Sequence, residues 1–99
     1  MERSPEDYRA KLQRVNFSDG ISKEEAIIIA QNYLIDQKSD KAFVLSKPRI
    51  SNSKLVDGCW AVSFPRTWRE QLEHGPLWSI VHIDKKTGKI KSSGGWPDL

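Results

Sequence analysis

The stretch DGCWAVSF, at residues 57–64, decides the fold that the sequence predicts. The Asp-Gly pair favours a turn, and the six residues after it alternate between large apolar and small side chains, which is the period of a β-strand. The large side chains lie on one face of this strand: Trp60, Val62 and Phe64. The small side chains lie on the other: Cys59, Ala61 and Ser63. We therefore expect a sheet with a second layer of structure against one of its faces.

The chain after this strand predicts a hairpin. Residues 77–84 form a strand with apolar side chains on both faces, as in strands that are covered on both sides. The sequence KKTG at residues 85–88 forms the turn, and the strand returns over residues 89–91. The lysines of the returning strand would protect a sheet edge from pairing with other chains. We expect residues 93–99 to be a tail.

The chain before residue 57 predicts one more strand. The apolar residues 42–45 form it, and it resumes after Pro48, where a proline indicates an edge or a bulge. The polar sequence SNSK at residues 51–54 predicts a loop. About four antiparallel strands are therefore expected in the sheet.

Two helices precede the strands. Ser4 and Pro5 suit the start of the first, whose narrow apolar stripe contains Tyr8, Leu12 and Val15. The sequence SKEE at residues 22–25 is a capping box that begins the second. The core face of the second helix covers a broad arc: Ala26, Ile27, Ile29, Ala30, Tyr33 and Leu34.

A third, short helix is predicted between the strands. Residues 67–70, TWRE, repeat the capping-box pattern, and Gly75 followed by Pro76 is a stop signal. The pattern predicts two helical turns over residues 68–74, with Trp68 and Leu72 on one side. The order of elements indicates an α+β fold, in which N-terminal helices pack on an antiparallel sheet and a short helix precedes the third strand.

Length and composition favour one domain over residues 1–99. We divide it into an N-terminal helical extension (1–20), a helix-plus-sheet core (21–92) and the tail (93–99). Hydrophobic residues make up 37% and charged residues 29%, a balance typical of a soluble globule. The longest apolar run, residues 26–30, is far too short to span a bilayer, and the charged first residues do not form a secretory signal. We expect a cytoplasmic protein without a membrane partner.

Residues that could carry chemistry do not form a recognisable site. Cys59 with His74 or His82 would make a nucleophile–base pair, but an apolar strand raises a thiol pKa. The same three residues and Asp84 lack zinc-site spacing. No glycine-rich phosphate loop precedes a helix. We therefore expect no enzymatic activity, no metal and no cofactor.

The formal net charge of +3 raises the question of whether the chain binds nucleic acid. Arg66, Trp68 and Arg69 do cluster, and lysines follow the predicted hairpin, but acidic residues are interspersed and edge lysines have a structural explanation. Nucleic-acid binding is therefore not favoured over protein binding.

The segment from Pro65 to Pro76 is long for a connection between two strands of a hairpin, and it carries the residue types that dominate protein–protein interfaces. One interpretation is that Trp68 and Leu72 pack on the sheet face that the long helix leaves bare. That interpretation does not account for the charged residues of the segment. We predict a protein-binding surface formed by six residues: Arg66, Trp68, Arg69, Glu73, His74 and Trp96.

The stretch at residues 57–64, followed by WSIVHIDKKTGKI at residues 78–90, resembles two groups of small bacterial domains. One is the YrhB-like immunity-protein family, whose members also carry a helical insertion before an Asp-Lys-x-Thr-Gly hairpin. The other is the PepSY domain of protease propeptides, which has a similar helix, a Trp-containing strand and a Thr-Gly hairpin. PepSY domains are usually exported, which favours the first family for this chain. The resemblance covers residues 21–95 and implies a non-enzymatic protein that binds and neutralises a toxin; it supplies no catalytic residues.

Two functions therefore stand as hypotheses. The first is a small protein-binding domain of the immunity type, with a protein partner. The second is a homodimer that binds a small ligand in a pocket between helix and sheet. The small residues of the 59–64 strand distinguish them, because they would leave space for a ligand only if they faced the helix.

Overall fold

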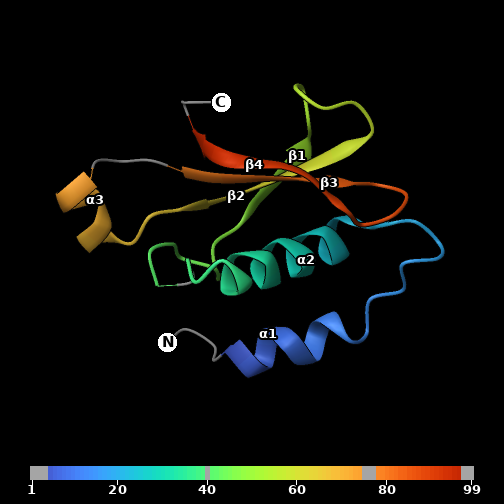
Figure 1. Ribbon diagram of the computed structural model, residues 1–99, viewed down its shortest axis with the longest axis horizontal. Coiled ribbons are helices and arrows are strands. Elements are labelled where there is room, and N and C mark those ends of the chain that lie inside the picture. Colours follow the sequence, from blue (N-terminus) through green and yellow to red (C-terminus); the bar gives the residue numbers. More distant parts are fainter. Residues whose placement is uncertain (1–4, 40, 75–77, 97–99) are drawn as a thin grey trace.

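The computed structural model describes residues 5–39, 41–74 and 78–96, and it confirms the α+β fold (Figure 1). A four-stranded antiparallel sheet is covered on one side by a long helix, and a short helix precedes the third strand. The elements in chain order are α1 Pro5–Leu12, α2 Lys23–Asp36, β1 Arg49–Asn52, β2 Cys59–Pro65, α3 Trp68–His74, β3 Trp78–Asp84 and β4 Ile90–Trp96.

The sheet is a simple meander in the order β1-β2-β3-β4, with each strand antiparallel to the next. Val62 lies opposite Val81, and Trp60 lies opposite Ile83. Opposite residues share a face, so the large side chains of β2 and β3 form one apolar inner face. The alternation predicted for residues 59–64 is confirmed, because Val62 and Phe64 are fully buried.

Helix α2 lies across this inner face, and α1 lies across α2 on the side away from the sheet (Figure 1). The predicted capping box is present: the Ser22 hydroxyl accepts from the Glu25 backbone N–H at 3.2 Å, and the Glu25 carboxylate accepts from the Ser22 N–H at 2.9 Å. The core joins the two layers and contains these fully buried side chains: Ala26, Ala30, Val62, Phe64, Val81 and Ile83.

Helix α1 is held to α2 by polar contacts as well as by Tyr8. The Asn32 side chain donates to the Tyr8 carbonyl at 2.9 Å, and Arg9 forms an ion pair with Asp36. The helix ends at Leu12, so Val15 lies in the turns that follow it rather than in a helical stripe.

The strand predicted over residues 42–45 is wrong. In that segment Phe43 makes an isolated bridge with Arg66, and the continuous strand is β1, which includes Ser51 of the predicted loop. The reason lies in Leu45, which turns into the core, where its carbonyl accepts from the Gln31 side chain at 2.8 Å. This backbone group is therefore engaged by α2. The segment keeps one hydrogen bond to β2, from the Val44 N–H to the Pro65 carbonyl at 2.8 Å, and continuous strand pairing begins only after Pro48.

The last strand is longer than the sequence indicates. The prediction ended it at residue 91 and assigned residues 93–99 to a tail, but β4 continues to Trp96. The glycines Gly94 and Gly95 do not break the strand, because β3 extends far enough to pair with them, at Ile80 and Ser79. Residues 97–99 lie outside the described part of the chain.

Candidate protein-binding surface

Helix α3 forms over the predicted residues, Trp68 to His74, and it projects from one end of the sheet (Figure 1). The Thr67 hydroxyl accepts from the Glu70 N–H at 3.4 Å, and the Gln71 side chain donates to the Arg66 carbonyl at 2.9 Å. The Thr67 N–H donates to the Ala42 carbonyl at 3.0 Å, which ties the start of the helix to the segment before β1. Within the described chain, α3 makes no extensive contact with another helix or strand.

The two large apolar side chains of α3 face solvent. Trp68 is 70% exposed and Leu72 is 77% exposed, although both are large apolar residues on one short helix. They are four residues apart and so lie on the same side of it. The interpretation in which they pack on the bare sheet face is wrong, because α3 lies beyond the end of the sheet and not over either face (Figure 1).

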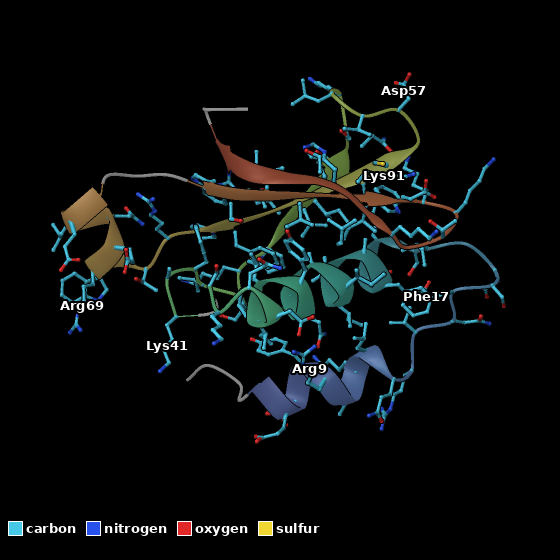
Figure 2. All side chains as sticks on the ribbon, viewed as in Figure 1. Arg9, Phe17, Lys41, Asp57, Arg69 and Lys91 are labelled. Atoms are coloured by element: carbon cyan, nitrogen blue, oxygen red, sulfur yellow. The ribbon has the colours of Figure 1, made fainter. Side chains whose placement is uncertain are left out.

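Charged residues surround this apolar pair. Arg69 and Glu73 are exposed on α3, and Arg66 precedes the helix at the bridge with Phe43. Figure 2 shows Arg69 and Lys41 at the same end of the molecule. We call the five residues Arg66, Trp68, Arg69, Leu72 and Glu73 the α3 surface. It contains four of the six residues that the sequence predicted for binding.

The other two predicted binding residues are less well placed by the structure. His74 is the last residue of α3, and the backbone of Trp96 lies opposite Trp78 at the end of the sheet nearest α3. The side chains of both His74 and Trp96 lie outside the described part of the chain. Their contribution to the surface stays a prediction.

The outer face of the sheet, opposite α2, carries a hollow that the sequence reasoning missed. It has a volume of about 240 Å³ and is lined by Arg49, Ser63, Trp78 and Ile80. The Arg49 guanidinium carbon lies 4.7 Å from the centre of the Trp78 ring, a cation–π contact. A neighbouring hollow of about 470 Å³ shares Arg49, Ser63 and Ile80 and extends toward β1. We call the first of these the outer hollow.

A signal for the outer hollow was present in the sequence. The apolar residues on both faces of β3 predicted that it is covered on both sides, which is wrong for Trp78 and Ile80, because one long helix can cover only one face of a sheet. Trp78 and Ile80 therefore lie on an uncovered face and are partly exposed. The sequence predicted that a strand resumes after Pro48, at Arg49, but the register that sets Arg49 opposite Ser63 came only from the structure.

The space left by the small residues of β2 also lies on this outer side. Since Val62 and Phe64 face α2, the side chains of Ala61 and Ser63 point away from the helix. The pocket hypothesis required these small residues to face α2. The interface between α2 and the sheet is instead filled by fully buried side chains.

Two of the residues considered for catalysis, Cys59 and His82, are buried in the sheet. Cys59 is buried, and burial raises the pKa of its thiol. The Ser53 hydroxyl oxygen lies 2.9 Å from Nδ1 of His82 and also accepts from the Val56 N–H at 3.0 Å, which holds the loop after β1 in place. Burial lowers the pKa of His82. The described residues contain no cluster of three histidine, cysteine or carboxylate side chains suited to a metal ion.

Comparisons with known proteins found no matching family model, no matching curated protein and no matching solved structure. The resemblance to immunity proteins therefore stays a prediction from the sequence. Among the described residues, no helix has the length and apolar character needed to cross a membrane.

Proposed function

We propose that this chain is a non-enzymatic protein-binding domain, which acts as an immunity-type inhibitor by covering a toxin with its α3 surface. The observation that carries the proposal is the exposure of Trp68 and Leu72, at 70% and 77%, on a helix that projects from the fold. Burying a large apolar side chain contributes about 1.5–3 kcal/mol, so both residues together could anchor a partner.

The surroundings of this pair support a protein partner. Arg66 and Arg69 flank the apolar residues, and tryptophan and arginine are enriched among the residues that dominate binding energy at protein interfaces. The charged side chains would form a polar rim around an apolar centre, which is the usual anatomy of such an interface. Inhibition then requires only that the bound chain block access to the toxin, without a cofactor.

The sequence resemblance supports the finer part of the proposal. It implies toxin neutralisation, with the hairpin at residues 78–90 as its most specific segment. We propose that the encounter takes place in the cytoplasm, because a chain with one cysteine has no intrachain disulfide that would require an oxidising compartment.

Affinity capture with matched variants tests the proposal. The tagged chain, the double variant Trp68→Ala/Leu72→Ala and a control, Leu55→Ala, are used to capture proteins from cells of the source organism. Leu55 is 66% exposed but lies in the loop after β1, so it matches the apolar exposure without sharing the surface. We expect one protein captured in stoichiometric amount by the wild type and by Leu55→Ala, and lost from the double variant.

A second step tests the inhibitor role. The captured protein is expressed alone and together with this chain, and growth is measured. We expect growth arrest that the wild type relieves and the double variant does not. Equal capture by all three chains, or a wild-type chain that captures nothing, would contradict the α3 surface as the binding site; a captured partner that is harmless alone would contradict the inhibitor role.

A further inference from the structure

We propose that the outer hollow binds a carboxylate of the protein partner, one that is flanked by an apolar side chain. This inference rests on the proposed function, because it names the chemistry of the partner that meets this end of the sheet. It concerns Arg49, Ser63, Trp78 and Ile80, and it does not use the residues of the α3 surface.

The two sites are continuous along the chain. Ser63 lies opposite both Arg49 and Ile80, and Pro65, two residues further, lies opposite Trp78. Helix α3 then begins at Trp68. A protein partner seated on α3 would therefore reach the outer hollow at the near end of β2 and β3 (Figure 1).

The outer hollow presents a cation without a matching anion. Arg49 is exposed, and its recorded contact is with the Trp78 ring rather than with a carboxylate. No acidic side chain lines either hollow among the residues described. Arg49 is the one charged side chain among the described residues that line the two hollows, so the local potential favours an anion.

The hydrogen-bond donors of Arg49 and Ser63, together with the apolar surface beside them, favour a carboxylate that is next to an apolar group. A guanidinium offers a planar fork of N–H donors that matches a carboxylate, and the Ser63 hydroxyl can donate a further hydrogen bond. Trp78 and Ile80 offer apolar surface beside these donors, where a flanking leucine or similar side chain can be buried. A nucleic acid is less well suited, because it needs several cations along a backbone and this hollow holds one.

The test uses two short peptides that differ in a single charge: acetyl-Leu-Glu-Leu-amide and acetyl-Leu-Gln-Leu-amide. Each is titrated into the isotopically labelled full chain, and the backbone amide resonances are followed by NMR. We expect the glutamate peptide to shift the resonances of Ser63, Trp78 and Ile80 saturably. The glutamine peptide should bind about two- to fivefold more weakly, the range that an exposed ion pair supplies.

Variants and a third probe decide between outcomes. Arg49→Gln should abolish the difference between the two peptides, whereas Lys86→Gln, which removes an exposed cation from the turn after β3, should preserve it. Equal binding of the two peptides, no saturable shift, or tighter binding of an eight-nucleotide oligothymidylate would each overturn the inference. If the peptide test fails but a partner is still captured through Trp68 and Leu72, only the inference about the outer hollow fails. If the glutamate peptide binds but capture does not depend on Trp68 and Leu72, the proposed function of the α3 surface fails.

Discussion

Helices α2 and α3 both follow a capping residue and both carry apolar side chains at helical spacing, but they differ in what those side chains meet. In α2 the apolar face is buried against β2 and β3, with Ala26 and Ala30 fully enclosed. In α3 the apolar side chains of Trp68 and Leu72 point into solvent. Apolar spacing therefore defines which side of a helix is apolar, and the position of the helix in the chain decides whether that side is covered.

The reason for the difference is the connection in which α3 lies. Strands β2 and β3 are neighbours in the sheet, and α3 joins the end of one to the start of the other. The end of β2 and the start of β3 lie at the same end of the sheet. A short connection between them stays at that end, so α3 lies beyond the strand ends (Figure 1). Helix α2 is twice as long, with 14 residues against seven, and it precedes the whole sheet, so it is able to lie across the strands.

The largest expected effect on stability comes from comparing a buried apolar side chain beneath α2 with an exposed one on α3. Phe64→Ala removes a fully buried ring from beneath α2 and should lower the free energy of unfolding by about 3–5 kcal/mol. Leu72→Ala removes a side chain that is 77% exposed and should change it by less than about 0.5 kcal/mol. Urea denaturation of both variants measures these changes, and a Leu72→Ala loss as large as that of Phe64→Ala would show that α3 packs on the fold.

A smaller effect compares the two capping residues. Ser22→Ala removes the hydroxyl that accepts from the Glu25 N–H, and should cost about 1 kcal/mol of global stability, because α2 unfolds only with the core. Thr67→Ala removes the equivalent acceptor from α3, which has little contact with the core. Its effect should appear as faster amide hydrogen exchange confined to residues 68–74, with the unfolding midpoint unchanged. A shift of the midpoint equal to that of Ser22→Ala would contradict the independence of α3.

The smallest effect concerns pH and the covered part of the outer face, where His82 lies against Ser53. Burial holds the pKa of His82 below its ordinary value of about 6.5, so the unfolded chain binds the proton more readily. Stability should therefore fall as the pH drops below about 6.5, and this loss should end once the pH passes below the pKa of the folded state.

The carboxylates of Glu25 and Asp84 change protonation at lower pH than His82, so their contributions to stability are separate from that of His82. Hydrogen bonds from the backbone lower the pKa of Glu25 and of Asp84, so the stability that they contribute is lost only below their ordinary values near pH 4. His82→Gln should flatten the unfolding free energy between pH 7 and pH 5 in urea titrations. An unchanged slope in that range would show that another group carries the effect.

The elements that the sequence predicted well are those specified by neighbouring residues. The capping box of residues 22–25, the alternation of residues 59–64 and the helix of residues 68–74 all depend on groups within a few positions of one another. Five of the six residues predicted for binding come from one connecting segment, residues 66–74, and the sixth is Trp96; that they bind a partner stays a prediction. These local patterns suffice because capping and side-chain period are properties of short stretches of backbone.

The misplaced elements depend on distant partners. The segment 42–45 has the composition of a strand, but Leu45 is drawn into the core and its carbonyl is bonded by Gln31 of α2. Strand β4 contains glycines that would end an isolated strand, but pairing with β3 continues to Trp96. In both cases a residue far along the chain satisfies the backbone and overrides local preference.

The sequence by itself determined the fold class, the apolar face of each long element and the bounds of α3, because these follow from local spacing and from the burial of apolar side chains. Only the tertiary structure decided that Trp68 and Leu72 face solvent, and that Arg49 lies over Trp78. Those two facts depend on strand register and on where a connection leaves the sheet. Both are set by pairing between residues far apart in the chain, which no local pattern of side chains specifies.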